Sequence, residues 1–281
     1  MAKTTAGKHN RVRLLIADID GTLVTKEKLL TPRSVEAVRK LDQAGVLFGV
    51  TTGRPPIGTK MLIDHLDGLK FIAGFNGGVV VRRDFSVFKV NLLPAAAAEE
   101  VVKMIQEHGL DVWLYTEKDW FVRDPKAYRV DREEKTVQFP PKVIPSFDGL
   151  YDRVTKLVGI SQDYDAVARC EKDVQTRLGA SVSAARSQPF YLDVTHPRAN
   201  KGEVVVMASE FGGIPVEEIA TIGDMQNDVT MFEKSGVSIA MGNASPEVQK
   251  AATYVTSSNA EDGFAKAVDE FILPRSGATA A

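Results

Sequence analysis

The sequence predicts an α/β fold in which a doubly wound, Rossmann-like parallel sheet carries an inserted α+β domain. Apolar segments rich in branched side chains, typical of strands buried on both faces, alternate with helical segments. Several of these strands end in carboxylates, hydroxyls or glycines. The alternation breaks off between about residues 88 and 194, where helices and strands follow one another without such ends. We therefore expect a discontinuous core domain over 11–87 and 195–273, and an inserted domain over 88–194.

The first predicted strand, Val12 to Ile16, runs into two carboxylates, Asp18 and Asp20, which are followed by Gly21 and Thr22. A buried strand avoids charge, so two acids at its end need water, a cation or a reaction to stabilise them. Ligands of open α/β sheets bind at the carboxyl ends of strands. The pattern therefore predicts a functional site directly after this strand.

A helix over residues 31–41 leads to the second strand, because Thr31 suits an N-cap and Pro32 the first helical position. The second strand begins at Val46 and ends in Thr51, Thr52, Gly53 and Arg54. A strand, helix and strand of these lengths form a βαβ unit, which brings both strand ends to one edge of a parallel sheet. We expect Thr52, or Thr51, to lie near Asp18.

A third segment begins at Asn200, whose pairing with Glu203 resembles a capping box at the start of an amphipathic helix. Lys201 then lies at a helix N-terminus, where the helix dipole disfavours a cation. The position predicts that Lys201 meets an anion.

A fourth segment, Glu218 to Gly223, is an apolar strand that carries Asp224, Asn227 and Asp228 into the next helix. A further turn, Gly74-Phe75-Asn76-Gly77-Gly78, follows the apolar pair Phe71-Ile72. Acids in a first helical turn are often only complements to the helix dipole, so the fourth segment alone is ambiguous.

Together the motifs Asp-x-Asp-Gly-Thr, Thr-Gly-Arg, Lys and Gly-Asp-x-x-Asn-Asp resemble the haloacid dehalogenase (HAD) superfamily of phosphohydrolases. They occur in the family's order, and the agreement spans residues 12 to 270. The turn around Asn76 resembles that of the Cof-type sugar phosphatase branch. The resemblance implies an HAD-type phosphoric monoester hydrolase whose large cap domain is inserted between the second and third motifs. Residues 195–198, Thr-His-Pro-Arg, are richer in potential anion contacts than the family pattern.

The chemistry of phosphate monoesters gives these residues roles. Hydrolysis needs a positioned nucleophile, and a carboxylate can fill that role by forming an aspartyl phosphate. We assign this role to Asp18. Asp20 points to the same side of an extended chain and can protonate the leaving alkoxide and later deprotonate water. Lys201 would lower the charge on the nucleophile and the phosphoryl group, and Thr52 would hydrogen-bond a phosphoryl oxygen.

Two acids beside a dianionic substrate call for a cation, and an all-oxygen site that keeps waters suits Mg²⁺. Asp18 and Asp224 would supply carboxylates, Asp20 its backbone carbonyl, and Asp228 would orient the waters of the metal. Zinc is not expected, because the four histidines and one cysteine show no ligand spacing. The substrate-binding residues implied by the resemblance are Thr52, Gly53, Arg54, Asn76, Lys201 and Asn227.

Composition is typical of a cytoplasmic enzyme of one or two domains, with 281 residues, 44% hydrophobic content and a net charge of −2. That charge offers no basic field for nucleic acid. No apolar run reaches membrane-spanning length, and the polar residues 1–10 are no signal peptide. The lone cysteine, Cys170, is interpreted as buried packing in a helix. We expect a small phosphate ester as partner, no membrane partner, and a monomer or small homo-oligomer.

The inserted domain is predicted to begin after a hairpin of residues 79–82 and 87–93. Helices are expected over 94–108 and 163–178, and strands over 112–115, 156–160, 180–186 and 190–194, with 139–145 as a loop. Candidate stacking surfaces for a sugar or ring are Trp113, Tyr115, Trp120, Phe121 and Tyr128, although each such aromatic is more often core than ligand contact.

Three functions are consistent with these residues. The first is a Mg²⁺-dependent phosphatase of small phosphorylated metabolites, sugar phosphates above all, acting through an aspartyl phosphate. The second is a phosphohexose mutase-like phosphotransferase, in which another hydroxyl replaces water. The third is a non-enzymatic signalling module that stores an aspartyl phosphate. Response-regulator receivers carry their phosphorylated Asp after a later strand and are far shorter, which favours the enzymes.

Overall fold

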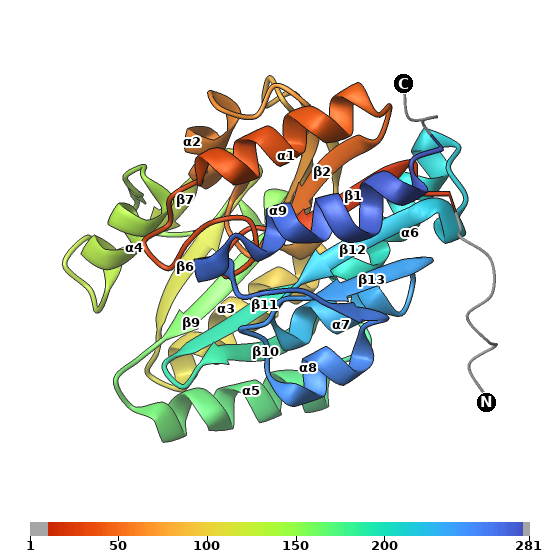
Figure 1. The fold of residues 1–281 in the computed structure, drawn as a ribbon. Coiled ribbons are helices and arrows are strands. Elements are labelled where there is room, and N and C mark those ends of the chain that lie inside the picture. The colour runs from red at the N-terminus through yellow and green to blue at the C-terminus, as the bar shows by residue number, and fades with distance from the viewer. Residues whose placement is uncertain (1–10, 278–281) are drawn as a thin grey trace. The chain divides into compact units, whose positions relative to one another are not determined.

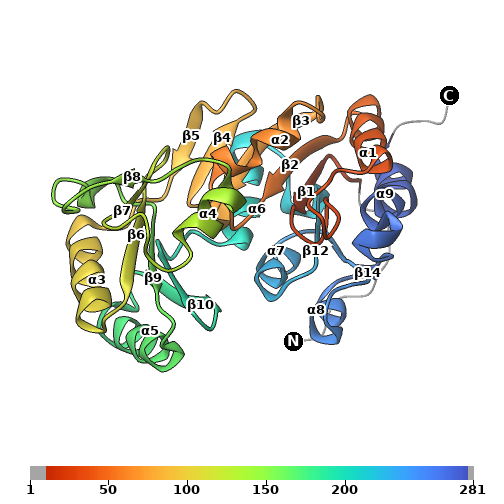
Figure 2. The same cartoon turned by 90° about the vertical axis from the view of Figure 1, so that its left-hand side faces the viewer.

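The computed structural model describes residues 11–277, and the predicted absence of a signal peptide concerns residues outside this range. The chain divides into two compact units (Figures 1 and 2). One comprises Met1–Thr51, Leu62–Phe71 and Lys201–Ala281, and the other comprises Thr52–Met61 and Ile72–Asn200. The elements α2 (Lys60–Ile63) and β3 (Leu69–Gly74) begin in one unit and end in the other. The predicted bounds of core and inserted domain stay a prediction.

The first unit contains parallel strands that pair in the order β14, β13, β12, β1, β2. Their bounds are Tyr254–Val255, Val237–Ala240, Ile219–Gly223, Leu14–Asp18 and Leu47–Thr51. All residues of β1 and β12 are buried, as their unbroken apolar sequences predict. Because the strands are parallel, their carboxyl ends lie at one edge, where Asp18 ends β1 and Thr51, its partner in the ladder, ends β2.

Helices cover both faces of this sheet. In both views α1 (Pro32–Gln43) and α9 (Gly263–Ala267) lie on one face, and α6 (Lys201–Gly212) and α7 (Val229–Phe232) on the other (Figures 1 and 2). A further helix, α8 (Pro246–Ala251), follows β13. The predicted start of α1 is confirmed, since the Thr31 hydroxyl accepts a hydrogen bond from the Ser34 amide at 3.1 Å and Pro32 is the first helical residue.

The second unit is built on a mostly antiparallel sheet in the order β10, β11, β9, β6, β7, β8. The bounds of these strands are Ser183–Gln188, Tyr191–Thr195, Lys156–Ile160, Asp111–Tyr115, Trp120–Val122 and Lys142–Val143. The helices α3 (Ala95–Glu107) and α5 (Tyr164–Leu178) share with this sheet an apolar core that includes the buried Cys170. The hairpin of β4 (Val79–Arg82) and β5 (Val87–Val90) also belongs to this unit.

The predicted α/β fold class is confirmed, and most predicted elements are observed within two or three residues of their expected ends. Three elements of the second unit were not predicted: β7, β8 and α4 (Val130–Val137). The helix α4 is strongly charged and buries only Val130 and Val137, so it shows no apolar stripe. The two-residue β8 lies inside the segment 139–145, which we expected to be a loop throughout. Strands this short carry too little alternation to be recognised.

Among residues 11–277, no helix combines the length and apolar character that crossing a bilayer requires.

Candidate active site

The two acids of the first motif have different surroundings. Asp18 is the last residue of β1 and is 5% exposed. Asp20 is partly exposed, and its Oδ1 atom forms an ion pair of 2.6 Å with Lys28 Nζ. Its backbone forms an isolated bridge with Val24. The chain therefore holds one acid inside the protein and the next acid at its surface.

Lys201 is the centre of a buried ion-pair network. It is the first residue of α6, and its side chain is 1% exposed. Nζ donates hydrogen bonds of 2.6 Å to Asp18 Oδ1 and to Asp228 Oδ1. The anion that the sequence led us to expect beside this lysine is thus a pair of carboxylates, which offset the unfavourable position at a helix N-terminus.

Asp228 is completely buried and both of its oxygens are engaged. Oδ1 accepts from Lys201, and Oδ2 accepts from the backbone amides of Asp224 and Met225 at 2.9 and 2.8 Å. A carboxylate fixed in this way orients the lysine and the turn after β12. The predicted role of Asp228, to orient the waters of the metal, stays a prediction.

Asp224 follows β12 and is held by residues from two other segments. The Thr22 hydroxyl donates to its Oδ1 at 2.8 Å, and the Asn243 side-chain amide donates to its Oδ2 at 3.4 Å. Gly21 packs directly against it: a Cβ at position 21 would lie 2.3 Å from Asp224 Oδ2, and the φ of +87° is one that favours glycine. The Asp-Gly-Thr motif thus makes room for Asp224 and hydrogen-bonds it.

Burial shifts the pKa values of this cluster. It raises the pKa of Asp18 to about 7, with Lys201 opposing the shift and Asp228 and Asp224 adding to it. Burial also raises the pKa of Asp224 to about 6, against the hydrogen bond from Thr22. For Lys201 burial alone would lower the pKa, but the two carboxylates outweigh it and the net shift is upward. The lysine therefore stays charged, whereas the ionised forms of Asp18 and Asp224 are only partly stabilised by positive charge.

The residues fit a divalent cation. Ligand oxygens of Asp18, Asp224 and Asp228 lie within 4.8 Å of one another, and all three residues are buried. Three carboxylates and one ammonium leave excess negative charge, which adds to the effect of burial in raising the acid pKa values. An all-oxygen donor set suits Mg²⁺ rather than a softer metal.

Four other predicted residues come together in the second unit. The Thr52 carbonyl accepts from the Asn76 amide at 2.7 Å, and the Arg54 carbonyl accepts from the Phe75 amide at 2.9 Å. Phe75 and Asn76 adopt positive φ values of 50° and 56°, so the Asn-Gly segment is a tight left-handed turn. The Thr52 hydroxyl accepts from the Arg54 amide at 3.2 Å, and Gly53 lies beside the Asn76 side chain.

The neighbouring Thr51 lies opposite Asp18 in the β1–β2 ladder. Its buried hydroxyl has no hydrogen-bond partner in the described part of the chain. The choice between Thr51 and Thr52 as phosphoryl contact stays open. Asn227 is exposed, and its backbone carbonyl accepts a hydrogen bond from the Thr230 hydroxyl at 2.9 Å.

Three contributors to the first unit's cluster were not assigned roles from the sequence: Thr22, Lys28 and Asn243. Asn243 follows β13, and its amide also donates to the Gly21 carbonyl at 3.0 Å. Its place just beyond a parallel strand is the signal that could have identified it.

The candidate aromatic surfaces separate into two groups. Trp113, Tyr115 and Trp120 form one buried cluster, in which Tyr115 and Trp120 stack with ring centroids 5.7 Å apart. Phe121 belongs instead to the apolar core under α3 and α5. Tyr128 is half-buried and packs edge-on against Phe190.

A family model described as haloacid dehalogenase-like hydrolase matches residues 15–268. A Bacillus subtilis protein, the 5-amino-6-(5-phospho-D-ribitylamino)uracil phosphatase YwtE, is 26% identical over 285 residues, which cover 93% of this chain and 98% of that protein. The Escherichia coli pyridoxal phosphate phosphatase YbhA is 25% identical over 273 residues, with 93% and 99% covered. The crystal structure of a haloacid dehalogenase-like hydrolase from Bacteroides thetaiotaomicron matches with a TM-score of 0.83 at 26% identity, covering 92% of this chain and 99% of that one.

Proposed function

Because the chain belongs to the haloacid dehalogenase-like hydrolases, we propose that it hydrolyses small phosphorylated metabolites with Mg²⁺ through an aspartyl phosphate at Asp18. The predicted family and the predicted class, a phosphoric monoester hydrolase, are confirmed. A non-enzymatic signalling role is thereby set aside. The observation that carries the proposal is the buried Lys201 between Asp18 and Asp228.

The proposed first step forms the aspartyl phosphate, an acyl phosphate. A carboxylate oxygen of Asp18 attacks phosphorus, and the bond from phosphorus to the leaving oxygen breaks. Support comes from the network around Asp18, because Lys201 holds Oδ1 by a hydrogen bond of 2.6 Å and leaves the carboxylate no freedom to turn away. The positive charge of Lys201 also offsets the charge that gathers on the phosphoryl oxygens.

Asp20 is the proposed proton donor and acceptor. It gives its proton to the leaving alkoxide, and later removes a proton from the water that attacks phosphorus and releases phosphate and free Asp18. Its partial exposure sets it apart from the buried acids and gives solvent access to its carboxyl group.

For the metal we propose ligation by the carboxylates of Asp18 and Asp224 and by the Asp20 carbonyl, with Asp228 positioned by Lys201. Bound there, Mg²⁺ would supply positive charge that neutralises phosphoryl oxygens and allows a dianion to approach the acids. Thr22 and Asn243 keep Asp224 in place for this role.

The assignment of Thr52, Gly53, Arg54, Asn76 and Asn227 to substrate binding stays a proposal that rests on the order of the motifs. The proposed substrate class is supported by two relatives named for small phosphorylated metabolites, a phosphoribitylamino-uracil and pyridoxal phosphate. We propose sugar phosphates as the first substrates to examine. Cytoplasmic location, the absence of nucleic-acid partners and a monomer or small oligomer stay predictions.

A phosphatase screen tests this function. The purified chain would be given a panel of sugar, polyol and cofactor phosphates, with Mg²⁺ or with excess chelator, and released phosphate would be measured. We expect phosphate release only with Mg²⁺, without any bisphosphate activator, and none from Asp18→Asn. Full activity in chelator would contradict the metal assignment. Isomerised product in place of free phosphate would instead favour the mutase alternative.

A further inference from the structure

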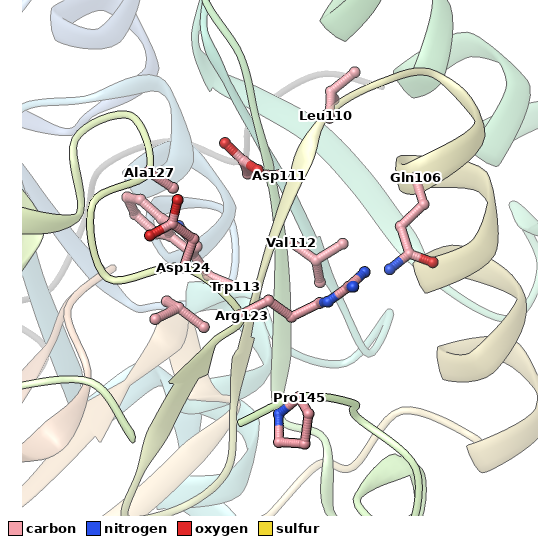
Figure 3. A pocket seen from close by; sticks show the side chains of 10 residues that line it. Gln106, Leu110, Asp111, Val112, Trp113, Arg123, Asp124, Ala127 and Pro145 are labelled. Atoms are coloured by element: carbon pink, nitrogen blue, oxygen red, sulfur yellow. The ribbon is translucent and has the colours of Figure 1, made fainter. Parts of the chain in front are cut away.

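A second candidate site lies in the second unit, and none of the residues that line it is used in the proposed mechanism. It is a cavity of about 460 Å³, bordered by the last turn of α3, the first half of β6 and the segment that follows β7 (Figure 3). This volume falls within the range of small-molecule sites in proteins.

The cavity results from the way in which two strands separate. β6 pairs with β7 only at Leu114 with Phe121 and at Tyr115 with Trp120. The pairing with β6 ends at Phe121, whereas Val122 still pairs with Val143 of β8 on the other edge of β7. The opening residues of β6, Asp111 to Trp113, pair with β9 on one edge and border the cavity instead of β7 on the other.

One end of the cavity is acidic. Asp111 and Asp124 both line it, and burial together with the charge of Asp124 raises the pKa of Asp111. The Lys126 amide donates to Asp124 Oδ1 at 2.8 Å, which fixes that side chain. The Asp111 carboxylate has no hydrogen bond or ion pair within residues 11–277. A ligand cation placed here would relieve the repulsion between the two acids.

A buried donor also lines the cavity. Trp113 is 1% exposed, and its Nε1–H has no hydrogen-bond partner among the residues that the structure describes. A buried N–H group without a partner destabilises a protein, so nearly all such groups are satisfied in native structures.

The other end of the cavity carries a positive charge. In Figure 3 the guanidinium of Arg123 and the side-chain amide of Gln106 point toward one another and away from the two carboxyl groups. Neither side chain has a partner elsewhere in the described range. The remaining lining includes the apolar side chains of Leu110, Val112 and Pro145.

We propose that this cavity binds a zwitterion of dipeptide size, with an ammonium group at Asp111 and Asp124 and a carboxylate at Arg123 and Gln106. The apolar walls would hold aliphatic side chains, and the cavity is larger than a single free amino acid needs. Charge-assisted hydrogen bonds at the two ends would fix the direction in which the ligand lies.

This proposal is tested by calorimetric titration of the full chain with L-leucyl-L-leucine. The titration is done without substrate and without Mg²⁺, so that its result does not depend on the proposed catalytic site. Saturable binding is expected, and capping the dipeptide as its N-acetyl or C-amide form should weaken it about tenfold or more, the value of one charge-assisted contact. Equal affinity for free leucine would contradict the predicted size. Equal affinity for the capped forms would contradict the predicted charges.

Variants locate the site. Asp111→Asn and Arg123→Gln should each weaken binding about tenfold, whereas Asp152→Asn, an exposed acid of the same unit, should change it less than about twofold. Asp111→Asn removes an unfavourable charge, so circular dichroism and melting should show a folded protein. Trp113 fluorescence should change on titration, and Trp113→Phe should remove that change. No binding at millimolar dipeptide, or equal losses in Asp152→Asn, would overturn the proposal whatever the catalytic activity.

Discussion

Replacement of Lys201 by methionine tests the energetics of the site most sharply. Methionine keeps a long unbranched side chain but removes the ammonium that neutralises Asp18 and Asp228. Removal of one partner from a buried ion pair typically destabilises a protein by about 3–5 kcal/mol, because the other charge is left buried. At roughly 2–4 °C per kcal/mol for a domain of 150–250 residues, the melting temperature should fall by about 6–20 °C.

A matched control is available in the same unit. Lys28 forms an ion pair of the same length, 2.6 Å, with Asp20, but its side chain is 51% exposed. An exposed pair contributes about 0–1 kcal/mol, so Lys28→Met should lower the melting temperature by no more than about 4 °C. Both variants remove Lys–Asp ion pairs of the same length, but Lys201 loses two buried pairs and Lys28 loses an exposed one.

Differential scanning calorimetry at pH 8 in chelator provides the measurement. At lower pH the melting temperatures of Lys201→Met and of the parent chain should lie closer together, because protonated carboxyl groups carry no charge for the ammonium to neutralise. If Lys201→Met melts within about 2 °C of the parent, or no lower than Lys28→Met, the cluster does not depend on a buried charge as we argue.

Three further predictions follow from the same geometry. Asp18 and Asp224 have pKa values raised to about 7 and 6, so the folded chain binds protons more tightly than the unfolded one. In chelator the free energy of unfolding should therefore fall as pH rises from about 4 to 7. Mg²⁺ should raise the melting temperature more at pH 8 than at pH 5, because protons and metal compete for the same carboxylates. A larger effect of Mg²⁺ at pH 5 would contradict this competition. Gly21→Ala should cost roughly 1–3 kcal/mol and weaken Mg²⁺ binding, because its Cβ would lie against Asp224. Gly45→Ala, with φ of +71° and open space around it, should cost stability alone, and calorimetric Mg²⁺ titration of both variants separates the effects. With an activated aryl phosphate, Asp20→Asn should regain turnover relative to Asp18→Asn, and equal loss would count against the roles assigned to these acids.

The parts of the site that could be predicted lie at the ends of strands. Branched apolar runs predict β1, β2 and β12, and the rule for parallel sheets brings their polar ends to one edge. Lys201 could be assigned an anionic partner because a cation at a helix N-terminus needs one. The sequence alone does not say which anion lies beside Lys201, and only the family resemblance relates Lys201 to the acids of the other motifs.

The remaining features depend on contacts between distant segments. Thr22 and Asn243 reach Asp224 across 202 and 19 residues of chain, and although Asn243 follows a parallel strand, no local pattern shows which side chain either residue will contact. The raised pKa of Asp18 depends on how completely the fold buries it. The cavity beside Trp113 depends on where β7 leaves β6, and the three-residue β7 could not be predicted.

Trapping of the phosphorylated enzyme tests the central claim most directly. Full-length chain with Mg²⁺ and a turned-over phosphate ester would be quenched with acid within the first turnover, digested and mapped by mass spectrometry. The account predicts one hydroxylamine-sensitive phosphoryl group on the peptide that contains Asp18, and none in Asp18→Asn. A phosphoryl group on any other residue, or turnover by Asp18→Asn at the parent rate, would contradict it.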